Sequence, residues 1–323
     1  MIDLALARFL HVERAASGEQ LALRLGVSRA AVWKRIEALR AAGLPVVAER
    51  GRGYRLSRAF DWLDADAIGA ALAPNTRRRL AAIEVLPMVD STMATIAAAA
   101  ARGADSGHAV FAEYQCAGRG RQGRQWLSPL ASQISFSVLW RFDCGLGALT
   151  GLGIAIGVAV ADALAALGVK RVALKWPNDV QVDGRKLAGI LIEAGGEWSG
   201  PCHALIGVGV NWNLGASGSA IDQAWTDVAS AGGSSHSRNQ AAAALLGALS
   251  RALGEFDSHG VGGFVARWEA RDALSGQAVA VREGDGIWHG VAHGIAVDGR
   301  LKVSVDGVER RIASAEVSVR VLR

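Results

Sequence analysis

Three arginines alternate with glycines in the stretch 109–129, which reads AVFAEYQCAGRGRQGRQWLSP. Arg119, Arg121 and Arg124 place three cations on an adaptable backbone, an arrangement suited to holding an anionic ligand. The spacing also matches the G-x-G-x-x-G fingerprint of dinucleotide-binding proteins, and arginines between glycines are often only solvated loop charge. The fingerprint needs a helix after its glycines, whereas Pro129 favours a turn. The stretch therefore favours an anion clamp over a dinucleotide site.

A second group of polar residues falls where predicted strands end or turn, namely Lys175, Asn178, Asp179, Lys186 and Asn211. With the arginine loop, the two lysines can neutralise a triphosphate and the charge that builds on a transferred α-phosphorus. Asp179 suits Mg²⁺, which takes one or two carboxylates together with phosphate oxygens and water. The sequence contains no Walker A motif and no recognisable Ser-His-Asp or Cys-His pairing. It therefore predicts catalysis by positioning and charge stabilisation rather than through a covalent enzyme intermediate.

The elements that must position these groups follow from apolar periodicity and turn residues. Asp90 or Ser91 can cap a predicted helix at 93–101. Asp183-Gly184 predicts a tight hairpin turn. Strands are predicted at 83–89, 133–140, 172–175, 180–182, 187–193 and 205–211, and further helices at 149–167, 239–256 and 261–271.

The first 60 residues predict a winged helix-turn-helix, with helices at 2–11, 18–25 and 29–42 and a basic hairpin at 45–56. These residues contain eleven Lys or Arg and five Asp or Glu, so they carry more positive charge than the whole chain, whose net charge is +5. A basic module of this kind favours nucleic acid, although a role in packing or dimerisation alone stays open. The candidate DNA-binding residues are Ser28, Arg29, Trp33, Lys34, Arg35 and Arg52.

Composition restricts the remaining classes. With 323 residues, 51% hydrophobic, the chain is long enough for two to three folded domains. Charged residues interrupt the first apolar residues, so we expect no secretory signal, and the apolar run 146–167 contains Asp162 and glycines and favours a buried helix over a membrane span. Three widely spaced cysteines indicate neither a disulfide framework nor a zinc site. We expect a cytoplasmic protein without a membrane partner.

The last part of the chain alternates apolar and polar residues from 279 to 322 and contains three Asp-Gly pairs, at 285–286, 298–299 and 306–307. This pattern predicts a small antiparallel β domain. The alanine-rich segment 61–82 predicts a linker that carries a short helix.

Five motifs, DSTM, EYQCAGRGRQGRQW, KWPNDV, RKLAGILIE and GVGVNWN, occur in this order. Together they resemble the bacterial family of bifunctional biotin-protein ligases that also repress biotin synthesis, over nearly the whole chain. The resemblance implies an α+β fold with a winged helix-turn-helix at 1–60, a linker at 61–82, a mixed α/β, class II synthetase-like ligase domain at 83–272, and an SH3-like small β-barrel at 273–323. It also implies ATP and biotin as substrates, Mg²⁺ as cofactor, and biotinyl-5′-adenylate as the intermediate.

Site residues are carried over from the matching motif positions. Lys186, Arg121 and Arg119 match the catalytic set. The positions that match the biotin site are Ser91, Thr92, Met93, Gln115, Arg119, Gly120, Arg121 and Lys186. Those that match the ATP site are Arg121, Lys175, Asn178, Asn211 and Trp225, with Asp179 for the metal. Met93, Cys116 and Gln122 depart from the family pattern, which has Asn, Gln and Arg at these positions.

The partners that the resemblance implies are the biotin carboxyl carrier protein of acetyl-CoA carboxylase, the operator DNA of biotin-synthesis genes, and a second copy of the chain when adenylate is bound. Three alternatives stay open: a ligase whose winged helix no longer binds DNA, a transcription factor that senses biotin without turnover, and a lipoate-protein ligase of related architecture.

Overall fold

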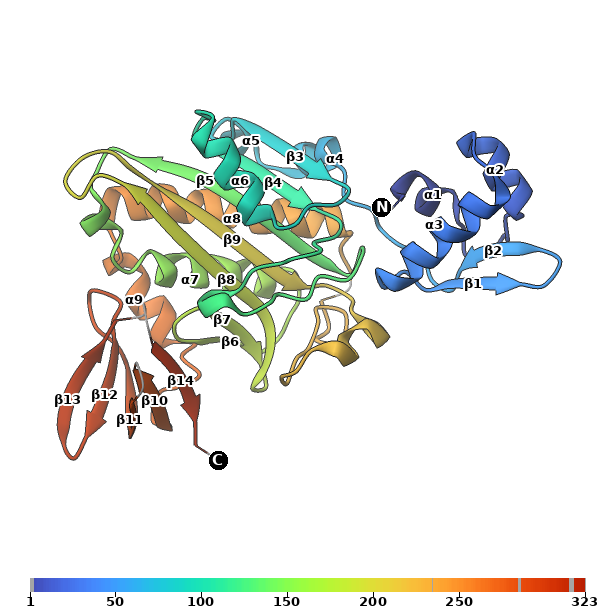
Figure 1. Cartoon of the computed structure of the whole chain (residues 1–323). Helices are drawn as coiled ribbons and strands as arrows, with labels where there is room; N and C mark the ends of the chain where they lie inside the picture. The colour runs from blue at the N-terminus through green and yellow to red at the C-terminus, as the bar shows by residue number, and fades with distance from the viewer. Residues whose placement is uncertain (1–2, 234, 284–285, 314–316, 323) are drawn as a thin grey trace.

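The computed structural model describes residues 3–322 except 234, 284–285 and 314–316. Its N-terminal part is the winged helix that the sequence predicts (Figure 1), made of α1 (Leu4–Phe9), α2 (Gly18–Leu25), α3 (Arg29–Ala41), β1 (Val46–Glu49) and β2 (Gly53–Leu56). Ser17 and Gln20 form a reciprocal capping box at the start of α2, and Ser28 caps α3. These caps start α2 and α3 at the predicted positions.

The central part is built on a seven-stranded sheet with the order β3-β4-β5-β9-β8-β7-β6. Only the β3–β4 pair is parallel. Asp183 and Gly184, both with positive φ, make the predicted tight turn between β7 and β8. The strands are β3 (Ala82–Leu86), β4 (His108–Ala112), β5 (Gln133–Phe142), β6 (Val172–Lys175), β7 (Asp179–Val182), β8 (Arg185–Gly196) and β9 (Cys202–Asn211).

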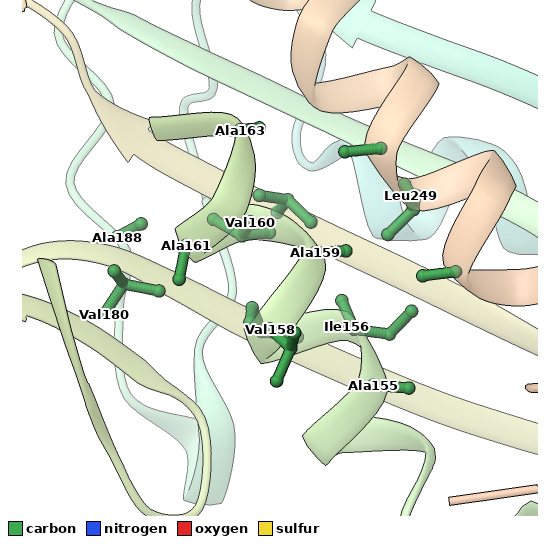
Figure 2. Packing of buried hydrophobic residues seen from close by; sticks show 14 of the residues in the cluster. Ala155, Ile156, Val158, Ala159, Val160, Ala161, Ala163, Val180, Ala188 and Leu249 are labelled. Atoms are coloured by element: carbon green, nitrogen blue, oxygen red, sulfur yellow. The ribbon is translucent and has the colours of Figure 1, made fainter. Parts of the chain in front are cut away.

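Helices cover both faces of this sheet. One face packs against α7 (Leu152–Ala166) and α8 (Arg238–His259). In Figure 2, side chains of α7 have the sheet residues Val180 and Ala188 on one side and Leu249 of α8 on the other. The other face packs against α6 (Thr92–Ala101), which Ser91 caps. Among the described residues, Leu146–Ala166 is the one stretch long and apolar enough to cross a membrane. Of its most apolar 18 residues, 67% are buried inside the protein, which agrees with the buried helix that the sequence predicts.

The segment 61–82 differs from the predicted linker. It forms α4 (Ala65–Ala71) and α5 (Pro74–Arg77), and its apolar residues Leu63, Ile68, Leu72 and Leu80 belong to the core of the central part. Four apolar side chains at irregular spacing in an alanine-rich stretch give little periodic signal, yet α4 finds a packing surface on α8. The segment is therefore a packed element.

The C-terminal part forms an antiparallel five-stranded sheet with the order β13-β12-β11-β10-β14. Asp306 and Gly307, both with positive φ, turn the chain between β12 and β13 as the sequence predicted. Asp285 of another predicted turn lies outside the described residues. After α9 (Gly262–Glu269), the strands are β10 (Ala278–Glu283), β11 (Gly286–Ile295), β12 (Leu301–Val305), β13 (Val308–Ile312) and β14 (Val317–Val321).

The winged helix is attached to the central part through the chain that follows the arginine loop. Leu130 and Ala131 are buried within the winged-helix core. The Leu130 N–H donates to Ala42 O, at the C-terminal end of α3, at 2.9 Å. Arg58 donates to Asn213 O at 3.1 Å. The end of the predicted recognition helix therefore contacts the segment that leads from the arginine loop into β5.

A buried ion pair joins the two strands that flank the arginine loop. Arg238 Nη1 lies 2.5 Å from Glu113 Oε2, and each residue is 1% exposed. Arg238 Nε donates to Gln133 O at 2.9 Å, and the second oxygen of Glu113 accepts from the Leu63 N–H at 2.5 Å. One guanidinium thus ties the end of β4 to the start of β5.

We expect Glu113→Ala to lower the free energy of unfolding by about 3–5 kcal/mol, because it leaves the Arg238 guanidinium buried without its counter-charge. Urea denaturation measures the change. Glu37→Ala is the control, since it breaks the partly exposed Glu37–Arg40 pair and should cost about 0–1 kcal/mol. Similar losses in the two variants would contradict the role of the buried pair.

Candidate active site

One cavity of about 870 Å³ collects every residue that the sequence proposed for ligand binding in the central part. It lies between the arginine loop, the N-terminal end of α6 and the ends of several sheet strands. These residues are Ser91, Thr92, Met93, Gln115, Arg119, Gly120, Arg121, Lys175, Asn178, Asp179, Lys186, Asn211 and Trp225. Elements separated by more than a hundred residues thus meet at one place.

The arginine loop folds back across the sheet and forms a wall of the cavity. Residues Arg121–Gly123 make a single 3₁₀ turn, and the α-helix that a dinucleotide fingerprint requires does not follow. Arg119 Nη2 lies 2.6 Å from Glu193 Oε1 on β8, and Arg121 Nη1 lies 3.4 Å from Asn178 Oδ1. Burial lowers the pKa of Arg121, while attraction to Asp179 opposes this shift. Both arginines therefore hold the loop against the sheet.

The end of the cavity at α6 combines fixed polar groups with an apolar surface. The Thr92 N–H donates to Gln115 Oε1 at 2.8 Å, and Ser137 Oγ donates to Thr92 Oγ1 at 2.8 Å. Met93, which is 2% exposed, packs against Gly207, where a Cβ would come within 2.8 Å of the Met93 sulfur. This end suits a compact ligand with both polar and apolar faces.

The opposite end of the cavity gathers positive charge around one carboxylate. Lys186 Nζ lies 2.7 Å from Asp179 Oδ1. Lys175 lies nearby, and burial is the main cause that lowers its pKa, while attraction to Asp179 opposes the shift and repulsion from Lys186 adds to it. Arg121, Arg124 and the β14 residue Arg320 complete the cationic lining. Such a surplus of cations in a partly buried site favours a phosphate-bearing ligand.

Trp126 lines the cavity and is packed against the sheet. Its Nε1 donates to Gln133 Oε1 at 2.9 Å, and its ring lies against Gly209, where a Cβ would be 2.5 Å away. Lys186 Nζ lies 5.5 Å from the centroid of the ring. Neither Gln133 nor Gly209 was predicted from the sequence as a residue of the site. The signal available for Gly209 was a glycine within a valine-rich strand, which often marks close approach of another group.

Asn211, the last residue of β9, and Trp225 also line the cavity. The Asn211 side-chain amide donates to Thr226 O at 2.9 Å and to Lys186 O at 3.3 Å. The Lys186 N–H donates to Ala224 O at 2.9 Å, and Trp225 is half-buried. The structure thus gives Asn211 a clear role in holding neighbouring chain segments, and its contact with a nucleotide stays a prediction.

The winged helix presents most of its candidate DNA-binding side chains to solvent. Trp33 is 55% exposed, and Arg29, Lys34 and Arg52 are exposed as well. Arg35 forms an ion pair with Asp3 that ties α3 to the start of α1, and its contact with DNA stays a prediction. Ser28 is exposed, and its hydroxyl accepts from the Ala31 N–H at 3.2 Å as a helix cap.

Three family models match successive parts of the chain. They describe a helix-turn-helix domain at 4–55, the biotin/lipoate A/B protein ligase family at 85–211, and the biotin protein ligase C-terminal domain at 274–320. The order agrees with the fold described above. The chain belongs to the biotin protein ligase family.

The chain matches known relatives over nearly their full length. The bifunctional ligase/repressor BirA of Salmonella typhimurium is 38% identical over 94% of this chain and 93% of its own length. BirA of Escherichia coli is 37% identical over 94% and 92%, respectively. Among solved structures, the biotin protein ligase of Aquifex aeolicus in complex with biotin and ATP superposes with a TM-score of 0.64, is 26% identical, and covers 74% of this chain and 99% of its own.

The exposed Cys116, at the start of the arginine loop, provides a test of the local geometry. Its Sγ donates to Asp90 Oδ1 at 3.1 Å, and this hydrogen bond is the main cause that raises the pKa of the thiol. Asp90→Asn should lower this pKa, increase the thiolate fraction at pH 8, and speed alkylation of Cys116 by iodoacetamide about two- to tenfold. Peptide mass spectrometry measures the rate. Asp143→Asn is the control; an equal or slower rate in Asp90→Asn would refute this geometry.

Proposed function

We propose that this chain is an ATP-dependent biotin-protein ligase that makes biotinyl-5′-adenylate and transfers biotin to a lysine of a biotin carboxyl carrier protein, and that it also represses biotin-synthesis genes. The observation that carries the ligase proposal is the single cavity in which the arginine loop, Lys186 and the polar end at α6 meet. It offers a binding surface for a compact polar and apolar molecule next to a surface for phosphates.

We place biotin at the α6 end of the cavity, with its ring system against Trp126 and its carboxylate towards Lys186. The residues that contact it are Ser91, Thr92, Met93, Gln115, Arg119, Gly120, Arg121 and Lys186. We place ATP across the cationic end, where its contacts are Arg121, Lys175, Asn178, Asn211 and Trp225. The 2.7 Å Lys186–Asp179 contact holds the ammonium group near the place where the two substrates meet.

In the first step, a carboxylate oxygen of biotin attacks the α-phosphorus of ATP. A new P–O bond forms, the bond to the β-phosphate oxygen breaks, and pyrophosphate leaves. Lys186, Arg119 and Arg121 stabilise the charge that develops on the phosphoryl oxygens. In the second step, the neutral amine of the acceptor lysine attacks the carbonyl carbon of the mixed anhydride. The C–N bond of the amide forms, the C–O bond to the phosphate breaks, AMP leaves, and the amine nitrogen releases one proton to water. The folded-back arginine loop shields the anhydride from water between the steps.

Asp179 is our candidate contact for Mg²⁺. The described residues include no group of three or more His, Cys, Asp or Glu side chains arranged to hold a metal, so a cage made of protein ligands alone is not available in that part of the chain. Asp179 Oδ1 pairs with Lys186 but accepts no hydrogen bond of good geometry. One carboxylate beside a triphosphate site fits Mg²⁺, which would neutralise phosphate charge when bound.

For regulation, we propose that the winged helix binds operator DNA of biotin-synthesis genes, and that two adenylate-bound copies bind together as a homodimer. Exposed Trp33, Lys34 and Arg52 support this reading. We place the borders of the functional parts near residues 60 and 272, with 61–82 packed on the ligase part, and we expect the protein to act in the cytoplasm.

Lys186→Ala should reduce the first step about 100- to 1,000-fold, because it removes a cation from the reacting phosphate. Biotin-dependent exchange of labelled pyrophosphate into ATP measures this step. The control is Lys170→Ala, which removes an exposed lysine outside the cavity. Near-normal exchange in Lys186→Ala would refute the assignment, and no exchange in the wild-type chain would refute the ligase proposal itself.

Arg52→Ala should weaken binding to promoter DNA of biotin-synthesis genes and reduce the slope of log affinity against log salt by about one, the loss of one phosphate contact. Filter-binding titrations at several salt concentrations, with biotin and ATP present, measure the slope. Arg311→Ala, an exposed arginine of the C-terminal sheet, is the control. Absence of DNA binding by the wild-type chain would instead favour a ligase whose winged helix has lost that role.

A further inference from the structure

Gln133, the first residue of β5, bridges two parts of the cavity with one side-chain amide. Its Oε1 accepts a hydrogen bond from Trp126 Nε1 at 2.9 Å, and its Nε2 donates to Asn211 Oδ1 at 2.9 Å. The residue is 2% exposed, so water competes little for either contact. The amide oxygen and the amide nitrogen therefore each have a hydrogen-bond partner, and these two hydrogen bonds fix the orientation of the amide.

The first contact leads to Lys186 through the indole of Trp126. The ring lies against the backbone of β8 and β9, since a Cβ added at Gly189 or Gly209 would come within 3.0 or 2.5 Å of it. Lys186 Nζ lies 5.5 Å from the ring centroid. On its other side, the ammonium is 2.7 Å from Asp179 Oδ1. The position of the indole therefore helps to define the position of the ammonium group.

The second contact leads to the backbone of the same lysine. Because Gln133 occupies the oxygen of the Asn211 side chain, the amide nitrogen of Asn211 points the other way, towards Lys186 O at 3.3 Å and Thr226 O at 2.9 Å. The Thr226 N–H also donates to Lys186 O at 2.9 Å. One glutamine amide thus influences both the side chain and the backbone of Lys186.

Gln133 is itself held firmly. Its carbonyl oxygen accepts from Arg238 Nε at 2.9 Å, and the residue pairs with Asn211 in the β5–β9 ladder. Arg238 is 1% exposed and is anchored by Glu113. A fixed backbone is what a residue needs in order to hold two other groups in place.

We propose that Gln133 is a positioning residue for adenylate formation, which acts through Trp126 and Asn211 to place Lys186 against the reacting phosphate. The inference rests on the proposed ligase function. Only a glutamine supplies both an acceptor for the indole and a donor for Asn211 at this reach. Glutamate would keep the acceptor and lose the donor, and methionine would lose both while keeping a similar size.

The test measures the kcat and KM of biotin-dependent pyrophosphate exchange in Gln133→Met, Gln133→Glu and the wild type. We expect Gln133→Met to reduce kcat/KM for biotin about 10- to 100-fold, since small displacements of catalytic groups have effects of this size. Gln133→Glu should lose less activity, because it keeps the indole contact. Gln20→Met is the control, since it removes a glutamine from the capping box of α2, away from the cavity.

A double-mutant cycle with Trp126→Phe separates positioning from general destabilisation. Phenylalanine keeps an aromatic ring but has no N–H to donate. The factor lost through Gln133→Met should be smaller in the Trp126→Phe background than in the wild type, whereas the factor lost through Gln133→Glu should be the same in both. A purely structural role would reduce activity by equal factors in all backgrounds and in proportion to the loss of Tm.

Activity of Gln133→Met within threefold of the wild type, or equal factors for Gln133→Met in both backgrounds, would overturn the proposal. If Gln133→Met does not fold, Gln133→Glu decides: a loss of fivefold or more in kcat/KM with an unchanged Tm supports the role, and a smaller loss, or a loss that goes with a lowered Tm, overturns it. Exchange by the wild-type chain is measured in the same experiment, so failure of the ligase proposal is distinguished from failure of this one.

Discussion

The buried guanidinium of Arg238 joins the two ends of the chain segment that carries the arginine loop. It binds the Glu113 carboxylate just after β4 and the Gln133 carbonyl at the start of β5. A charge in this position is stable only because each of its contacts is satisfied, so the loop ends cannot drift independently. Glu113 also binds the Leu63 N–H, so the segment that leaves the winged helix is joined to the same cluster.

A loop with fixed ends can be mobile in its middle and still return to one place. The middle carries Arg119 and Arg121, which in this structure bind Glu193 and Asn178 across the cavity. Glu193 lies on β8 and Asn178 lies in the turn before β7, while both arginines line the cavity together with Lys175 and Lys186, so closing the loop adds cations to a site that already has a surplus of positive charge. The arrangement suits a reaction in which negative charge develops on a phosphoryl group and the product must be kept from water.

Local signals in the sequence predicted much of this molecule, and the remainder depends on contacts between distant residues. The caps at Ser17 and Ser28 and the turn at Asp183-Gly184 are decided within a few residues, which is why the winged helix and the β7–β8 hairpin were predicted correctly. The motifs also predicted which residues line the cavity. Nothing local could reveal that Gln133 joins Trp126 to Asn211. The alanine-rich composition of 61–82 predicts a linker with a short helix, and no local signal shows that α8 provides a surface on which its apolar residues pack.

The central claim is that one cavity holds both substrates, with their junction at Lys186 beneath the arginine loop. A crystal structure of the chain with a non-hydrolysable analogue of biotinyl-5′-adenylate tests it most directly. We expect the biotin rings between Thr92 and Trp126, the phosphate beside Lys186, and Gly120 and Arg121 closed over the linkage. An analogue bound elsewhere, or bound with Lys186 turned away from its phosphate, would show that the two substrates do not meet at Lys186.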